Sequence, residues 1–138
     1  MSKTKEVPKA TRGQRNCNPG NIRYNKFNRW LGLIGKDNKG FCRFSSVEYG
    51  FRALVVLLKR YLYYGYDTPK KIISRFAPVT ENNTVSYIRF VCDRCCISED
   101  TKIYDSSSSF YDLISAIAMY ESNIDITGLM IKEIYDSF

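Results

Sequence analysis

The 138-residue sequence contains no histidine. This absence excludes a Ser-His-Asp triad, a Cys-His nucleophile pair and a histidine-ligated metal site. If the protein is an enzyme, carboxylates must carry its proton transfers. The candidates for general acid–base chemistry are therefore aspartates and glutamates.

Long apolar runs are absent as well. No segment is long enough to span a membrane, and the first residues, MSKTKEVPKATRG, lack the apolar core of a secretory signal. We expect synthesis in the cytoplasm without a signal peptide. A protein that acts on the cell wall or in the periplasm would then need phage lysis, a virion or a secretion system to carry it there. Candidate protein partners are a delivery apparatus or an immunity protein.

The cysteines do not form a metal-binding pattern. They are few, odd in number and partly clustered: Cys17, Cys42, Cys92, Cys95 and Cys96. The stretch CDRCC is similar to half of a zinc site, but Cys17 and Cys42 are isolated and supply no second pair. An odd, clustered set favours buried thiols in a reducing compartment over a disulfide framework. We expect no metal and no cofactor.

The composition is that of a folded, basic protein. Hydrophobic residues make up 44% of the chain, aromatic residues 14%, and the formal net charge is +7. These values indicate one domain with an apolar core, which we expect to be monomeric. The positive charge favours an anionic partner such as nucleic acid, a lipid surface or a cell-wall polymer. The Lys and Arg residues are spread along the chain without a base-reading helix, which argues against nucleic acid.

The hydrophobic pattern predicts a mainly α fold with a small β or loop region near the N-terminus. Residues 1–11 form a polar, basic stretch that we expect to be a flexible tail, and residues 12–138 form a single domain. The glycine-punctuated segment 22–44 predicts short strands or an irregular hairpin. Apolar spacing then predicts about five helices. They lie at 46–64, after Thr68, over TVSYIRFVCDRCC, from Phe110 to Glu121, and after Thr127.

Two of the three glutamates that merit comparison have simple structural explanations. Glu48 follows Ser45 by three residues, which is the spacing of a helix capping box. Glu81 lies in a polar loop that enters a helix, where the helix dipole favours an acidic residue. Ser109 precedes Asp112 by three residues, and this spacing places the start of the next helix near Ser109.

Glu121 is different, because it continues an apolar stripe. Phe110, Ile114, Ile117 and Glu121 follow one another at helical spacing, so the carboxyl lies at the C-terminal end of a buried face. Partial burial and the negative end of the helix dipole both raise the pKa of a carboxyl group. A raised pKa suits a general acid near neutral pH. The alternative is that Glu121 rotates into solvent at the end of the helix.

Several motifs together resemble a family of small phage and prophage proteins. The chain contains RGQRNCNPGNIR, then WLG at 30–32, FCRF at 41–44 and GFRA at 50–53, and the similarity continues through IISRFAPVTENNTVSYI. These proteins are often labelled phage structural proteins and resemble lysozymes. The similarity extends over residues 12 to about 125, and it implies a lysozyme-like fold.

A more distant similarity connects the same segments with peptidoglycan glucosaminidases and lytic transglycosylases. Those enzymes carry a catalytic Glu, in an Ala-x-x-x-Glu-Ser context, before the Asn-rich turn. Here only Glu6 precedes that turn, and the matching motif AIAMYES lies at 116–122. This order is that of a circularly permuted lysozyme-like domain. Permutation is physically reasonable where the termini of a domain lie close together.

The resemblance implies a set of site residues. Glu121 would be the general acid, and Glu81 or Glu48 a second carboxylate. The implied substrate-binding residues are Arg15, Asn18, Asn21, Tyr24, Glu48, Asn83 and Tyr87. Tyr24 and Tyr87 could stack on sugar rings or belong to the core, and for Trp30 we favour the core.

Two functions from different classes fit the sequence. The first is cleavage of peptidoglycan glycan strands, by hydrolysis or by formation of an anhydro ring. The second is a non-catalytic virion component or basic nucleic-acid-binding module that has a lysozyme-like fold, since fold alone does not determine function. The first requires Glu121 to lie in a cleft that faces the Asn18–Tyr24 turn.

Overall fold

The computed structural model describes residues 9–78 and 83–138. Over these residues the chain forms six helices and two strands, in agreement with a mainly α fold that carries a small sheet near its N-terminus. The helices are α1 (Arg12–Arg15), α2 (Val47–Tyr63), α3 (Pro69–Phe76), α4 (Thr84–Cys95), α5 (Ser108–Ser122) and α6 (Gly128–Asp136), and the strands are β1 (Leu33–Lys36) and β2 (Cys42–Phe44).

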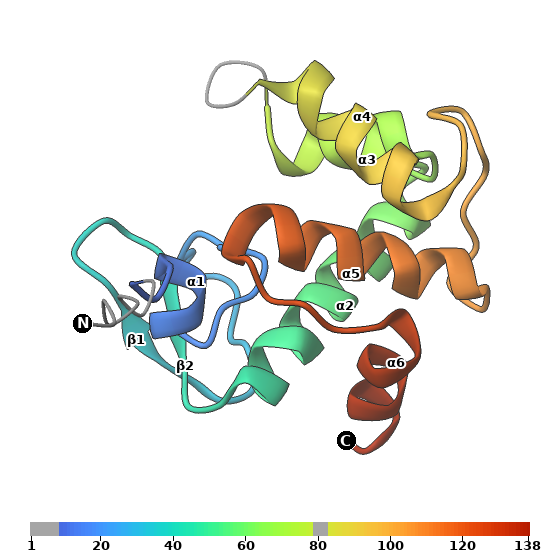
Figure 1. Cartoon of the computed structure of the whole chain (residues 1–138). Helices are drawn as coiled ribbons and strands as arrows, with labels where there is room; N and C mark the ends of the chain where they lie inside the picture. Colours follow the sequence, from blue (N-terminus) through green and yellow to red (C-terminus); the bar gives the residue numbers. More distant parts are fainter. Residues whose placement is uncertain (1–8, 79–82) are drawn as a thin grey trace, which may run out of the picture.

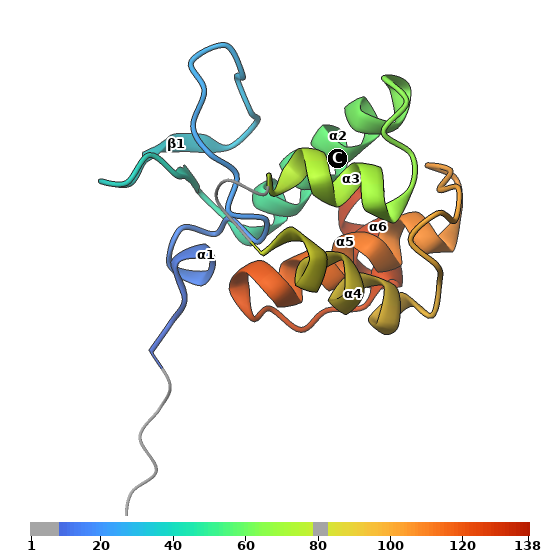
Figure 2. The same cartoon turned by 90° about the horizontal axis from the view of Figure 1, so that it is seen from above.

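The elements divide into two lobes (Figures 1 and 2). The N-terminal lobe, residues 9–46, contains α1 and the two strands, and the helical lobe contains α2–α6. The C-terminal end of α5 points from the helical lobe toward α1 in both views. Residues far apart in the sequence therefore meet where the two lobes join.

Helix α5 is the centre of the helical lobe. Phe110, Leu113, Ile114 and Ile117 are fully buried, as the stripe predicted, but Ala116 and Ala118 are fully buried too. The helix packs against α1, α2, α4 and α6, so it is enclosed on several sides. Small alanine side chains allow neighbouring segments to approach the faces that lie outside the stripe. The single apolar stripe in the sequence therefore accounts for only part of the buried surface of α5.

Two helix starts behave as the sequence predicted, and two do not. The Thr68 and Thr127 side chains accept hydrogen bonds from Lys71 N and Met130 N and cap α3 and α6. In contrast, Ser46 rather than Ser45 caps α2, and Ser107 rather than Ser109 precedes α5. A capping-box spacing occurs by chance where serines follow one another, and the apolar pattern does not fix the first turn to within one or two residues.

Two further expectations are corrected by burial. The apolar pattern of this segment predicts that Val85 shares a buried face with Ile88 and Val91, but Val85 is exposed, whereas Ile88, Val91 and Tyr87 are buried. The thiols are not uniformly buried: Cys42 is inside the core and Cys96 is exposed. Cys96 adopts a left-handed conformation where α4 ends.

The N-terminal lobe has little regular structure. Strands β1 and β2 pair antiparallel, and the turn between them is organised by Asp37, whose carboxylate accepts hydrogen bonds from Lys39 N and Phe41 N. The expected tail ends earlier than residue 11, because Thr11 caps α1 and its hydroxyl also reaches α5. Residues 1–8 lie outside the described part of the chain.

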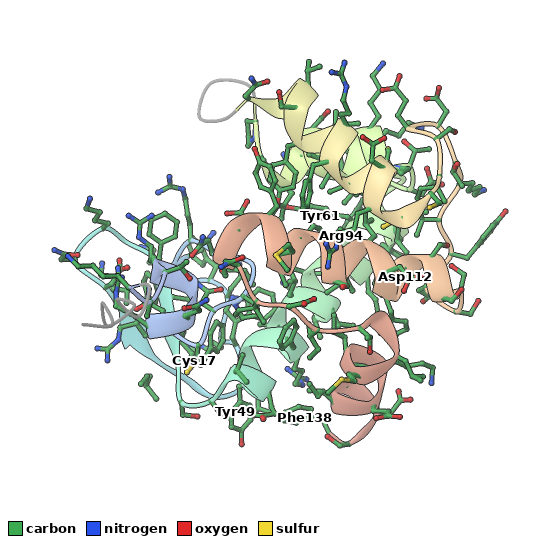
Figure 3. The ribbon with its side chains drawn as sticks, in the orientation of Figure 1. Cys17, Tyr49, Tyr61, Arg94, Asp112 and Phe138 are labelled. Carbon is green, nitrogen blue, oxygen red and sulfur yellow. The ribbon has the colours of Figure 1, made fainter. Side chains whose placement is uncertain are left out.

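The C-terminus closes the fold against the start of α2. The rings of Tyr49 and Phe138 are 5.3 Å apart, and Figure 3 shows the two side chains next to each other. In the parts of the chain that are described, no helix is both long and apolar enough to cross a membrane.

Candidate active site

Glu121 lies at the C-terminal end of α5, where the helical lobe meets the N-terminal lobe. Its side chain is half-buried, and this burial raises the pKa of the carboxyl above its usual 4.5. Tyr87 and Asn21 act in the opposite direction and lower the pKa, because their polar groups stabilise the carboxylate. The net effect is a carboxyl group that holds its proton to higher pH than an exposed glutamate does.

Asn21 connects this carboxyl to the N-terminal lobe. Its Nδ2 donates to Glu121 Oε1 at 3.2 Å and to the Glu121 backbone O at 3.0 Å. Asn21 has a φ of 47°, a left-handed conformation that asparagine tolerates better than most residues. The asparagine-rich turn thus faces Glu121, as the glycosidase hypothesis requires.

Helix α1 holds the end of α5 from the other side. Thr11 Oγ1 and Gln14 Nε2 donate to the Ser122 backbone O at 2.7 Å and 3.1 Å, and Gln14 Nε2 also donates to Asn123 O. These bonds satisfy carbonyl groups that a helix leaves free at its C-terminus. A Cβ at Gly13 would collide with the Ser122 side chain, so this close approach requires glycine. The motif RGQR therefore helps to fix the position of the residue that follows Glu121.

A cleft of about 600 Å³ opens beside Glu121. It lies between the two lobes and has walls from both. Its lining residues are Arg12, Gly20, Asn21, Ile22, Arg23, Tyr24, Asn25, Asn28, Trp30, Phe41, Leu57, Tyr61, Phe76, Ala77, Pro78 and Glu121. A mixture of aromatic rings, amides and charged groups of this kind suits a polar ligand with flat apolar faces, such as a sugar chain.

Three buried polar atoms at this junction have no hydrogen-bond partner among the residues that are described. They are Asn21 Oδ1, Trp30 Nε1 and the Tyr87 hydroxyl. Buried polar groups in proteins are rarely left unpaired, so each of these atoms calls for an explanation, of which a role at a functional site is one. Asn21 and Trp30 line the cleft itself.

Tyr87 supports Glu121 from within the core. Its ring is fully buried and stacks on Tyr120 with centroids 3.7 Å apart. Burial and the neighbouring Glu121 carboxylate raise the pKa of the Tyr87 hydroxyl well above 10, so it stays protonated. The hydroxyl is close enough to perturb the pKa of Glu121 but lies outside regular hydrogen-bond geometry.

The structure brings some of the predicted site residues together and separates others. Glu121, Asn21 and Tyr24 line the cleft. Tyr87 contacts Glu121 from behind and is fully buried, so of the two alternatives it belongs to the core, and Trp30 is buried as expected. Glu81 lies outside the described residues.

Besides Tyr87, four implied residues are not in the cleft lining. Asn18 is fully buried: its side chain bonds Ile22 N, Ile22 O and Cys42 O, each at 3.0 Å, so it shapes the turn instead of binding substrate. Arg15 is exposed and donates to Ala10 O. Glu48 is exposed in the first turn of α2. Asn83 caps α4 by accepting from Ser86 N.

Sequence reasoning missed a basic part of the cleft wall. The guanidinium groups of Arg12 and Arg23 lie 4.3 Å and 4.7 Å from the centre of the Phe41 ring. Arg12 also faces Asp37 at 3.9 Å, and hydrogen bonds from Phe41 N and Asn16, with others, lower the pKa of Asp37 to about 2. No spacing rule connects these residues, because irregular loops bring them together.

The described part of the chain contains no group of three or more Cys, Asp or Glu side chains that could hold a metal ion. Among the described residues, the cleft offers the Glu121 carboxyl, the two arginines and the surrounding amides and rings.

Comparison with known proteins shows similarity to a phage protein. No family model matches the chain. The sequence is 34% identical over 106 residues to Protein P5 of the Pseudoalteromonas phage PM2, an alignment that covers 74% of this chain. The chain matches 66% of that protein's length, slightly less than two thirds. The protein is thus similar to a phage protein whose name states no activity.

Proposed function

We propose that the protein cleaves the glycan strands of peptidoglycan and that Glu121 is the general acid. The observation that carries this proposal is the half-buried carboxyl with a raised pKa, held by Asn21 on the wall of a 600 Å³ cleft. A carboxyl of this kind protonates the glycosidic oxygen as an oxocarbenium-like state develops. Similarity to a phage protein supports a phage or prophage origin, in which wall cleavage has an evident use.

Two courses remain open for the second half of the reaction. Hydrolysis with a second carboxylate requires an acidic partner across the scissile bond. Among the described residues Glu121 is the only carboxylate in the cleft lining, and Glu48 lies elsewhere. Formation of an anhydro ring requires only one glutamate, which first acts as acid and then as base.

The test is digestion of purified peptidoglycan by the wild type and by Glu121→Gln, with mass analysis of the products. We expect muropeptides from the wild type and a loss of at least about a hundredfold in the variant, the scale typical of general acid catalysis. Glu133→Gln, an exposed substitution on α6, is the matched control. Reducing or anhydro end groups distinguish the two courses.

A second candidate function is a non-catalytic role in a virion, which the similarity to a phage protein also supports. Wild-type protein that is folded, binds wall material and releases no products would favour it. Full activity in Glu121→Gln would instead remove Glu121 as the acid.

A further inference from the structure

A second pocket lies on the helical lobe and shares no residue with the cleft. It has a volume of about 560 Å³ and is formed by α3 with the segments that flank it. Its lining residues are Tyr66, Thr68, Lys70, Lys71, Ser74, Arg75 and Asp100. Nothing in the proposed acid chemistry uses these side chains.

The pocket is positively charged. Lys70, Lys71 and Arg75 contribute three cations to its lining, against the single carboxylate of Asp100. Lys71 lies 3.9 Å from Asp67, just outside the lining. In the described parts of the chain, Lys70 and Arg75 have no acidic group within ion-pair distance. Their charges are therefore available to an anionic ligand.

Arg75 is placed to recognise a planar anion. Its guanidinium lies 5.6 Å from the centre of the Tyr66 ring, which restricts its position. A guanidinium presents paired N–H donors that match the two oxygens of a carboxylate. Lys70, five residues earlier on α3, adds a second charge to the pocket lining.

The pocket adjoins the cleft. Tyr61 lines the cleft and Tyr66 lines the pocket, and their rings are 6.0 Å apart in an edge-on contact. Arg75 in the pocket is followed directly by Phe76 in the cleft. Figure 3 shows Tyr61 in the helical lobe. A polymer that leaves the cleft at this side meets the basic pocket next.

We propose that this pocket binds carboxylates of the peptide stems on the same peptidoglycan strand whose glycan occupies the cleft. This inference rests on the proposed function and adds a substrate-binding site to it. The contiguity of pocket and cleft favours a branched, anionic wall polymer. Nucleic acid is less well suited, because its affinity comes from many cations spread along a backbone rather than from two in a pocket.

The test measures binding to intact peptidoglycan sacculi in a Glu121→Gln background, which limits digestion. Lys70→Gln/Arg75→Gln is compared with Arg43→Gln/Arg89→Gln, which removes the same charge from exposed positions outside both pockets. Losing two charge-assisted contacts should weaken binding roughly tenfold in the first pair, with a much smaller change in the second. Sacculi whose carboxylates have been amidated should bind the background protein as weakly as native sacculi bind the first pair.

Each outcome decides the proposal. Equal weakening by both pairs means that net charge alone attracts the wall, and overturns it. Unchanged binding to amidated sacculi overturns it as well. If Lys70→Gln/Arg75→Gln loses affinity for double-stranded DNA and not for sacculi, the pocket binds nucleic acid instead. Digestion by protein with Glu121 intact is measured separately. If the protein cleaves peptidoglycan and Lys70→Gln/Arg75→Gln has no effect, only this inference is refuted. If the protein binds sacculi without cleaving them, only the proposed reaction is refuted.

Discussion

Different interactions stabilise the interior of each lobe. In the helical lobe, apolar side chains such as Phe51, Leu58 and Ile117 are buried almost completely, and hydrophobic packing supplies the stability. In the N-terminal lobe the strands are short, and buried polar side chains such as Asn16 and Asn18 hold the loops through hydrogen bonds to other residues. The helical lobe thus depends mainly on buried apolar area, whereas the N-terminal lobe, which also buries Trp30, Cys42 and Phe44, adds directional hydrogen bonds from buried asparagines.

This difference explains where the candidate site lies. A packed helix is a rigid support for a carboxyl, and a hydrogen-bonded loop can present amide donors at fixed positions. Glu121 comes from the first lobe and Asn21 from the second, and Asn21 Nδ2 joins them. Substitutions in the two lobes should therefore change stability by different amounts and over different regions of the chain.

The largest effect is expected in the helical lobe. Ile117→Ala removes a fully buried side chain from α5 and should lower the free energy of unfolding by about 2–5 kcal/mol, through lost burial and a residual cavity. Urea unfolding monitored by circular dichroism measures this. Leu129→Ala, at an exposed position on α6, is the control and should change stability by less than about 0.5 kcal/mol. A small effect at Ile117 would mean that α5 is not the centre of the core.

A smaller, local effect is expected in the N-terminal lobe. Asn18→Ala leaves Ile22 N, Ile22 O and Cys42 O without their side-chain partner and should cost about 1–3 kcal/mol. Hydrogen exchange should increase over residues 16–24 and much less in α5, and peptidoglycan cleavage should fall because Asn21 moves. Asn38→Ala, in an exposed turn, is the control. An equal increase in exchange across α5 would show that the two lobes open as one unit.

The same contrast explains what the sequence could predict. Helical spacing identified α2–α6 and most of their buried residues, because packing on one face leaves a periodic pattern. It also placed Glu121 at the end of a buried stripe. The contacts of the N-terminal lobe leave no such pattern. Asn18 and Asn21 are three residues apart and of the same type, yet one is buried in the turn and the other reaches Glu121.

The cleft wall was predictable only in part for the same reason. Tyr24 and Asn21 were expected from the resemblance, whereas Arg12 and Arg23 were not, because their positions depend on how both arginines pack on Phe41. Likewise, the sequence did not predict α1, because a helix of four residues carries too little periodicity to be recognised.

The smallest expected change in stability comes from Glu121, at the junction of the two lobes, and its sign follows from the raised pKa of the carboxyl. Burial raises the pKa of Glu121 above 4.5, the value expected in the unfolded chain. At pH values between the unfolded and folded pKa, the folded state therefore binds the Glu121 proton more tightly than the unfolded state does. Stability contributed by the protonated group is present at low pH and is lost as pH rises through the folded pKa. At neutral pH the ionised carboxylate therefore destabilises the fold.

Glu121→Gln should remove this cost, because the amide stays neutral and its Oε1 can still accept from Asn21 Nδ2. We expect a gain of about 0.5–1 kcal/mol at pH 8, in the lower part of the range for single stabilising substitutions. The gain should disappear below pH 4, where the wild-type carboxyl is also neutral. Thermal unfolding of both proteins across this pH range measures the difference, with Glu133→Gln as the exposed control. A gain of the same size at both ends of the range would mean that something other than the buried negative charge destabilises this junction.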